Sequence, residues 1–288
     1  SFVIHWSVPM PVPLLDVSAQ NLPLESELQA AFTKVLHHGR FIMGPEMETF
    51  EHEVAAMTGA KHALSVSSGT DALLLALMAL DIKPCDEVLC PAFTFFATAE
   101  AIARRGATPV FVDIDPVTFN MDPAAVAAAI TPRTKAIIPV HLYGLVADMD
   151  AIGSIAARAG IPVIEDAAQA CMATYKGIAL GTIGDLGCLS FHETKNIICG
   201  EGGALLINRS ELIERAEIIR EKGTNRSKFF RGEVDKYSWT DIGSSYGLSE
   251  INAAFLYAQL LKAKSIIKNR VKIWNDYHHL FHKLEKEK

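Results

Sequence analysis

The sequence predicts a three-layer α/β/α domain built on a mostly parallel sheet. Short apolar runs alternate with helical patterns between about residues 60 and 210, and this alternation is typical of α/β proteins. The predicted strands are apolar throughout, with no polar alternation, so helices should cover both faces of the sheet. In such sheets ligands collect beyond the carboxyl ends of the strands. The residues that directly follow each strand are therefore the first candidates for a site.

Three strand–helix pairs make up the first half of the alternating region. Strands are expected at 63–66, 87–90 and 109–112, followed by helices at 70–80, 98–105 and 123–130. The apolar stretch of the first helix lies between Asp71 and Asp81, and it is too short to span a membrane. Asp122 is a typical N-cap for the third helix, and Pro123 suits its first position.

The second half adds four strands and a helical end. Strands are expected at 136–140, 162–165, 186–191 and 204–207, and helices at 149–159, 211–222 and 249 to about 286. The last two strands flank a glycine-rich stretch at 200–203. A long basic and aromatic loop, 223–247, separates the last two helices. Loops of this length in compact proteins are usually functional or partner-facing.

These elements suggest three regions. Residues 1–13 mix aromatics and prolines and are interpreted as an N-terminal arm or an expression scar, since they lack the features of a signal peptide. Residues 14–247 form the large domain. Residues 248–288 are expected to be a helix that leads into a C-terminal domain that is largely absent.

Composition excludes several classes of protein. The net charge of −6 and the pI near 5.9 argue against a nucleic-acid-binding face. No apolar run is long enough to span a membrane. The five cysteines are odd in number and form no CxxC pair, which favours a reducing, cytoplasmic location and small buried side chains. Three histidines near the end of the chain are interpreted as a solvated helix face, and no metal site is predicted.

Two post-strand segments carry groups suited to a phosphate and a flat ring. Residues 67–71 (SSGTD) precede a helix, and free N–H groups at a helix start favour a phosphate. Ser, Thr and Asp are also ordinary helix caps, and by itself this signal is weak. Residues 91–96 (PAFTFF) offer an aromatic face to a ring, although phenylalanines are commonly core residues.

Two further segments carry an acid and an amine. Asp166 ends an apolar strand, where a carboxylate is either a cap, an ion-pair partner or the acid that keeps a pyridine nitrogen protonated. Lys195 follows another strand, and in a dry pocket its pKa would fall and its amine become nucleophilic. The segment is not the zinc motif HExxH, because Asn196 stands where the second histidine would be. Taken together, the four segments predict a pyridoxal 5′-phosphate site.

The chain resembles the DegT/StrS-type nucleotide-sugar aminotransferases over about residues 12–263. The resemblance is carried by the motifs GRFIMGP at 39–45, SGTDAL at 68–73, PVHLYG at 139–144, EDAAQ at 165–169, SFHETK at 190–195 and GEGG at 200–203. It implies the aspartate aminotransferase-like fold type I. Residues from about 172 to 260 most closely resemble the branch that makes dTDP-4-amino-4,6-dideoxygalactose.

The resemblance also implies roles for individual residues. Lys195 would form the Schiff base and later shuttle the proton between the cofactor and the substrate carbon. The cofactor would be held by Gly69, Thr70, Phe95, Asp166, Gln169, Ser190, Lys195 and Ser245, with Phe95 stacked on the ring and Gln169 bonded to its phenolic oxygen. Members of the family are usually homodimers, and Ser245 would reach the phosphate from the partner's loop. His192, Arg226 and Arg231 are candidates for substrate binding, and dimer salt bridges explain the two arginines equally well.

The expected reaction is transfer of an amino group from L-glutamate to a 4-keto-6-deoxy nucleotide sugar, with dTDP-4-keto-6-deoxyglucose as the expected acceptor. A 3-keto nucleotide sugar is the alternative acceptor. A sugar dehydratase and a non-catalytic relative are also considered, but relatives that dehydrate carry histidine in place of Lys195, and a non-catalytic relative should have lost Lys195 or Asp166. Two departures from the family pattern are Cys171, where many members have histidine, and Ser245, where many have asparagine.

Overall fold

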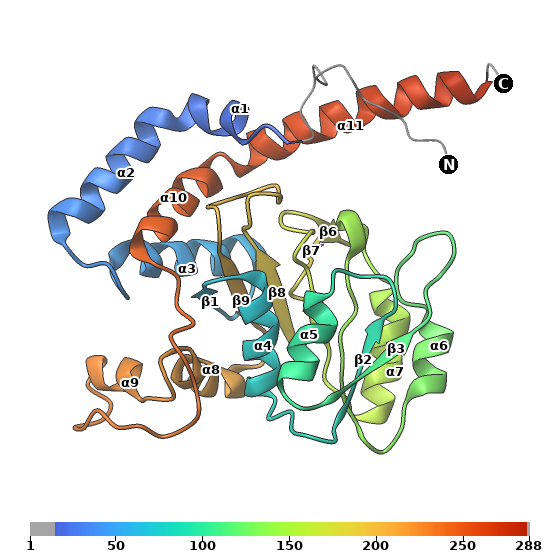
Figure 1. The fold of residues 1–288 in the computed structure, drawn as a ribbon, viewed down its shortest axis with the longest axis horizontal. Coiled ribbons are helices and arrows are strands. Elements are labelled where there is room, and N and C mark those ends of the chain that lie inside the picture. Colours follow the sequence, from blue (N-terminus) through green and yellow to red (C-terminus); the bar gives the residue numbers. More distant parts are fainter. Residues whose placement is uncertain (1–14, 287–288) are drawn as a thin grey trace, which may run out of the picture.

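The computed structural model describes residues 15–286 and shows a sheet enclosed by helices (Figure 1). The predicted arm 1–13 lies outside the described residues. The helices are α1 (Val17–Asn21), α2 (Glu25–His38), α3 (Pro45–Thr58), α4 (Gly69–Ala79), α5 (Ala97–Arg104), α6 (Pro123–Ala129), α7 (Met149–Ala159), α8 (Ile213–Arg220), α9 (Arg226–Phe230), α10 (Glu250–Leu261) and α11 (Ala263–Lys286). The strands are β1 (His62–Val66), β2 (Glu87–Pro91), β3 (Thr108–Val112), β4 (Thr134–Ile137), β5 (Ile164–Asp166), β6 (Thr174–Tyr175), β7 (Ile178–Ala179), β8 (Leu186–Ser190) and β9 (Gly203–Ile207).

The central sheet is mostly parallel, as predicted. Strands β1, β9, β8 and β5 form one ladder and β3, β2 and β4 another. Parallel bridges from Ile137 to Val163 and from Val140 to Asp166 join the two ladders. The order across the sheet is therefore β1-β9-β8-β5-β4-β2-β3. Within this sheet β9 runs antiparallel to both its neighbours, and the other pairings are parallel.

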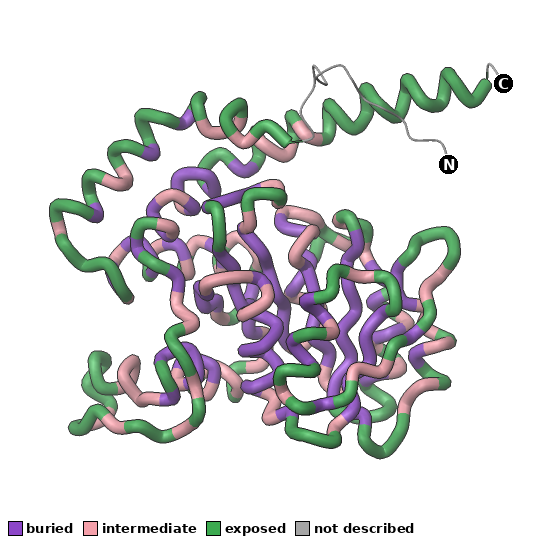
Figure 2. Tube along the Cα trace, in the orientation of Figure 1, coloured by how far each residue is buried: buried purple, intermediate pink, exposed green. Residues whose placement is uncertain are grey.

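Helices cover both faces of the sheet and give the predicted three layers. One face packs against α4, α5 and α8, and the other packs against α3 and α10 at one end and α6 and α7 at the other. The alternation of side chains along a strand produces this division. Leu205 and Ile207 of β9 enter the first core, and Ala204 and Leu206 enter the second. The strands are accordingly buried at the centre of the molecule (Figure 2).

Two strands differ from their expected form. β4 spans Thr134–Ile137 and not 136–140; Pro139 has no N–H to donate to a ladder, which accounts for the earlier end. β3 is not buried on both faces, and Phe111 is 59% exposed. It is an edge strand of the described sheet, so only one neighbour shields it.

The later part of the chain also departs from expectation. The expected continuous helix from 249 divides at Lys262 into α10 and α11, where the chain leaves the body of the protein. The loop 223–247 contains the short helix α9. A small hairpin, β6–β7, was not predicted; its two turn residues, Lys176 and Gly177, both have positive φ, as a type I′ turn requires. None of the helices described between residues 15 and 286 is both long and apolar enough to cross a membrane.

Candidate active site

Four parallel strands bring their following segments to one edge of the sheet. α4 follows β1, the aromatic segment 91–96 follows β2, Asp166 ends β5, and Lys195 lies in the loop after β8. These segments border a cavity of about 550 Å³, here called the main cavity. Among the predicted cofactor residues, Gly69, Thr70, Phe95, Asp166, Gln169, Ser190 and Lys195 line it, and so does His192. The structure therefore brings together seven of the eight residues predicted to hold the cofactor.

The start of α4 and the end of β8 form the part of the main cavity suited to a phosphate. Ser68 caps α4 by accepting a hydrogen bond from the backbone N–H of Asp71 (3.0 Å). Gly69 packs so closely on β8 that an added Cβ would lie 2.7 Å from the Cβ of Ser190. The glycine thus places the first N–H groups of an 11-residue helix beside the Ser190 hydroxyl. Free N–H groups and a hydroxyl at a helix start are suited to an anion.

Asp166 is the buried acid of the main cavity. It is 6% exposed, and its carboxylate accepts hydrogen bonds from the Thr98 hydroxyl (2.8 Å) and the Ala168 N–H (3.2 Å). Burial raises the pKa of Asp166, while those two donors and the nearby His141 and Lys195 oppose the rise. A cation placed against this carboxylate would favour its charged form. Sequence reasoning missed Thr98, whose position in α5 gives no signal of a contact 68 residues away.

Behind Asp166 lies a fully buried pair, His141 and Glu165. Nδ1 of His141 accepts the Ala147 N–H, so Nε2 carries the hydrogen and donates it to Glu165 (2.8 Å). Glu165 also accepts the backbone N–H groups of the turn that precedes β8, and the backbone N–H of His141 donates to the carbonyl of Asp166 (3.0 Å). The pair thereby fixes the end of β5 that carries Asp166. His141 belongs to the motif PVHLYG and Glu165 to the motif EDAAQ, but the sequence analysis assigned neither residue a role.

Lys195 faces the main cavity and a second hollow. It is half-buried, and burial lowers its pKa, against the opposing effect of the Asp166 charge. The direction agrees with the pKa predicted for a nucleophilic amine. The second hollow, of about 380 Å³, is lined by Lys195, Gln169, Tyr143 and Cys171, among others. Lys195 therefore stands between two adjoining spaces and borders both.

Gln169 and Phe95 complete the ring-sized part of the main cavity. The side-chain carbonyl of Gln169 accepts the Tyr143 N–H, which leaves the amide NH₂ to donate elsewhere. Phe95 is 58% exposed, and its ring lies 4.2 Å from that of Phe96 between centroids. An exposed aromatic ring at the border of a cavity is available for stacking.

Three predicted residues lie away from the main cavity within this chain. Ser245 is exposed, and its backbone pairs with Glu221. Arg226 and Arg231 line a different pocket, of about 610 Å³. Arg231 binds Glu217 (3.0 Å) and Glu233 (2.7 Å), and Arg226 lies 3.6 Å from Glu221. Their predicted roles involve a partner subunit or a substrate, and these roles stay predictions.

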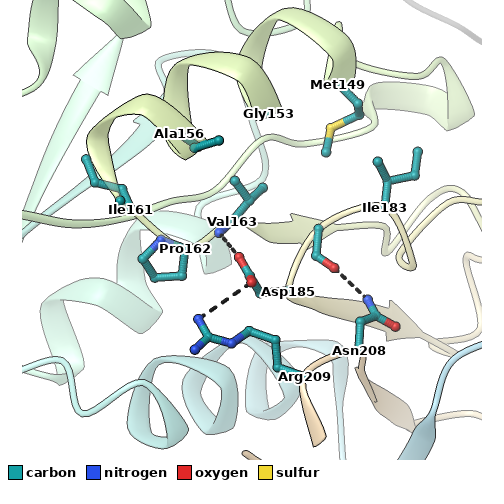
Figure 3. Close-up of a pocket in the computed structure, with 13 residues that line it drawn as sticks. Met149, Gly153, Ala156, Ile161, Pro162, Val163, Ile183, Asp185, Asn208 and Arg209 are labelled. Atoms are coloured by element: carbon teal, nitrogen blue, oxygen red, sulfur yellow. Dashed lines mark hydrogen bonds and ion pairs between the residues drawn. The ribbon is translucent and has the colours of Figure 1, made fainter.

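A hollow of about 490 Å³ lies at the opposite edge of the sheet, near the starts of β5 and β8 (Figure 3). Its polar groups bind one another. Asp185 accepts the Val163 N–H (2.7 Å) and pairs with Arg209 (3.6 Å), and Asn208 donates to the carbonyl of Gly184 (2.8 Å). Since these groups satisfy one another, they hold strands together and leave little for a ligand.

The main cavity offers an anion cradle, a stacking ring, an acid and an amine, which is the set of groups that grips pyridoxal phosphate. This site and the three-layer sheet define the class of fold-type I pyridoxal-phosphate proteins. The chain belongs to the DegT/DnrJ/EryC1/StrS aminotransferase family, whose model matches residues 23–288. Pyridoxal phosphate is the cofactor of this family.

Similar proteins support this placement. The chain is 48% identical over 248 residues to the "pleiotropic regulatory protein" of Geobacillus stearothermophilus, covering 86% of this chain and 64% of that relative. It is 42% identical over 267 residues to the UDP-2-acetamido-2-deoxy-3-oxo-D-glucuronate aminotransferase of Pseudomonas aeruginosa, covering 92% and 72%. A crystal structure of a family member from Brucella abortus matches with a TM-score of 0.87 at 37% identity, covering 94% and 73%. The chain thus spans roughly two thirds to three quarters of the length of these proteins.

Proposed function

We propose that this protein transfers an amino group from L-glutamate to the keto group of a nucleotide sugar, with pyridoxal phosphate as cofactor. The observation that carries the proposal is the placement of Lys195 and Asp166 on one cavity, with the start of α4 on the same cavity. Burial shifts both pKa values toward the uncharged forms. A neutral amine is the form of lysine that attacks an aldehyde.

When bound, pyridoxal phosphate supplies the electron sink for the reaction. The proposed roles of the protein's groups follow from their positions. Asp166 holds the proton on the ring nitrogen, and Thr98 orients Asp166. Lys195 Nζ would carry the cofactor and would serve as the base that moves a proton to and from the substrate carbon. The amide of Gln169 donates to the phenolic oxygen, and Gly69, Thr70 and Ser190 hold the phosphate.

The position of amination is C3 or C4. The resemblance of residues 172–260 favours C4 and the acceptor dTDP-4-keto-6-deoxyglucose. The Pseudomonas aeruginosa relative is named for a 3-oxo substrate and is similar over 92% of the chain, which favours a 3-keto sugar. Incubation with L-glutamate and each keto sugar, followed by NMR of the product, decides between them.

The proposed assembly is a homodimer in which Ser245 of each subunit reaches the other's phosphate site. Ser245 is exposed and outside the main cavity of its own chain, as that arrangement requires. The proposed location is the cytoplasm, where cysteines stay reduced. All five cysteines are free in this structure, and four of them are buried.

A regulatory role is the second candidate, because the relative from Geobacillus stearothermophilus is named as a regulatory protein. The presence of both Lys195 and Asp166 favours catalysis over this alternative. A dehydratase is disfavoured by Lys195, since that chemistry replaces the lysine by histidine in this family.

Borohydride trapping tests the proposal. Protein mixed with pyridoxal phosphate and reduced should carry the cofactor covalently on the peptide containing Lys195, as read by mass spectrometry. Lys195→Ala should carry none there, and Lys61→Ala, at an exposed lysine outside the cavity, should label like the wild type. Labelling of another lysine in the wild type, or of none, contradicts the proposal.

A further inference from the structure

The loop that carries Lys195 is held from outside the sheet by side chains of α1 and α11. Arg270 of α11 donates to the backbone carbonyl of Lys195 (3.2 Å), and Gln20 of α1 donates to the backbone carbonyl of Asn196 (3.2 Å). These are the carbonyls of the proposed catalytic residue and its immediate neighbour. α1 is the first helix of the described residues and α11 is the last (Figure 1).

The three polar side chains concerned form one connected network, called here the clamp: Gln20, Gln259 and Arg270. The Gln20 amide donates to Gln259 (2.9 Å), and its carbonyl accepts from Arg270 (3.3 Å). Gln259 is fully buried and donates to Asn21 (2.6 Å). Each member is therefore oriented by another member, so the two bonds to the loop have a defined geometry.

Arg270 is an unusual member of α11. This helix is exposed along nearly all of its length (Figure 2), with Ala263 as its one buried residue in the described part. Arg270 is half-buried, and burial lowers its pKa with no opposing acidic group among the described residues. Burying part of a cation whose partners are a carbonyl and an amide costs free energy, and the hydrogen bonds to those two groups offset part of that cost.

Beside these bonds, the loop is anchored by the packing of Ile197, which is fully buried in the core. Its base is paired through Cys199 N–H to the Phe191 carbonyl (2.9 Å) and Glu193 N–H to the Gly200 carbonyl (3.0 Å). At the tip, the N–H of Lys195 donates to the His192 carbonyl (2.9 Å) within the loop itself. Among the described residues, the carbonyls at 195 and 196 are thus the points at which the tip is hydrogen-bonded to other elements.

We propose that Arg270 and Gln20 are positioning residues that fix the backbone of the Lys195 loop and so set where the lysine amine stands relative to the cofactor. The inference rests on the proposed function, since it assumes that Lys195 bears the cofactor. Misplacement of a reacting group by about 1 Å can reduce a rate about a hundredfold, so a restraint on the backbone of Lys195 itself should affect the rate of the reaction.

Amide hydrogen exchange of the cofactor-free protein tests the restraint directly. In Arg270→Met, amides of residues 193–199 should exchange about tenfold to a hundredfold faster, the change that loss of one charge-assisted hydrogen bond produces in a local opening equilibrium. Lys268→Met, at an exposed position of the same helix, is the matched control and should leave the loop unchanged. Faster exchange confined to α11 would mean that Arg270 only stabilises its own helix, and this result overturns the proposal.

A kinetic measurement tests the link to Lys195. The visible absorption that develops when pyridoxal phosphate attaches to Lys195 gives the rate of attachment, and Arg270→Met should lower this rate about tenfold to hundredfold because the amine is misplaced. Arg270→Lys keeps a donor at this position and should restore part of the rate. An unchanged rate in Arg270→Met overturns the proposal.

Gln20→Leu keeps the proposal testable if Arg270→Met does not fold. It removes the bond to the Asn196 carbonyl, so loop exchange should accelerate and the attachment of pyridoxal phosphate should slow, as in Arg270→Met. Wild-type exchange in this variant contradicts the clamp. If the wild type binds no cofactor, the proposed function fails, and the exchange measurements still decide whether the clamp holds the loop.

Discussion

Thr98→Val is the substitution that most directly tests how the fold controls Asp166. Thr98 is fully buried in the first turn of α5, and its hydroxyl lies 2.8 Å from Asp166 Oδ2 and 2.9 Å from the Thr94 hydroxyl. An ionised carboxylate only accepts hydrogen bonds. Thr98 must therefore donate to Asp166, and Thr94 must donate to Thr98. Valine has nearly the same shape, so the change removes the donor with little disturbance of packing.

The expected effect is weaker cofactor binding. A hydrogen bond to a charged group contributes about 1.5–3 kcal/mol, so its loss should lower the affinity for the cofactor by no more than about tenfold to hundredfold. Burial already raises the pKa of Asp166, and Thr98 opposes that rise. Loss of the donor raises the pKa further, and the ionised acid is the form that holds a cationic ring. The fall in affinity on the acid side should therefore begin at a higher pH in the variant.

The measurement is a titration with pyridoxal phosphate at a series of pH values, followed by the absorbance of bound cofactor. Thr98→Ser retains the hydroxyl and serves as the matched control, with binding close to that of the wild type. Equal affinity and an equal acid limb in Thr98→Val and the wild type would refute the reasoning, because Asp166 would then not depend on this bond.

Two further predictions concern the cradle and the buried acid. Gly69→Ala places a methyl 2.7 Å from Ser190 Cβ, so it should destabilise the protein by about 1–3 kcal/mol in denaturant unfolding and weaken cofactor binding. The matched control is Gly153→Ala, in the interior of α7 beside the hollow of Figure 3, where an added methyl meets nothing within 4 Å. This variant should be more stable than the wild type by about 0.5–1 kcal/mol. A similar loss of stability in both variants would contradict the explanation from the contact with Ser190. Asp166→Asn should stabilise the cofactor-free protein, and the gain should grow as pH rises above about 4. An acid whose pKa is raised by folding lowers the stability of the protein as pH rises from its unfolded pKa to its folded pKa, and asparagine does not ionise. Thermal unfolding from pH 4 to 8 checks this, and a gain independent of pH would refute it.

Periodicity and composition were sufficient to predict the architecture. The seven predicted strands all form, because uninterrupted apolar runs between helical patterns have few other stable arrangements. The boundaries were less accurate: β4 ends before Pro139, and the last helix divides at Lys262. Whether a strand lies at an edge, as β3 does, depends on its neighbours in space, and local sequence does not carry that information.

The site was predictable where a residue directly follows a strand. Asp166 and Lys195 were found in this way, and the structure places them on one cavity. The residues that support them were missed because their contacts span long separations in sequence. Thr98 and Arg270 belong to helices whose local patterns indicate nothing about the carboxylate and the carbonyl that they bind.

The opposite shifts at Asp166 and Lys195 have a common cause and different consequences. Burial raises the pKa of the acid and lowers that of the amine, so it shifts each group toward its uncharged form. A cationic ring nitrogen beside Asp166 would reverse the first shift, because an opposite charge favours ionisation. The amine needs no such reversal, since its neutral form is the nucleophile. Cofactor binding should therefore lower the pKa of the acid, while burial keeps the pKa of the amine below its ordinary value, and one cavity thereby shifts each group toward the form that its proposed role requires.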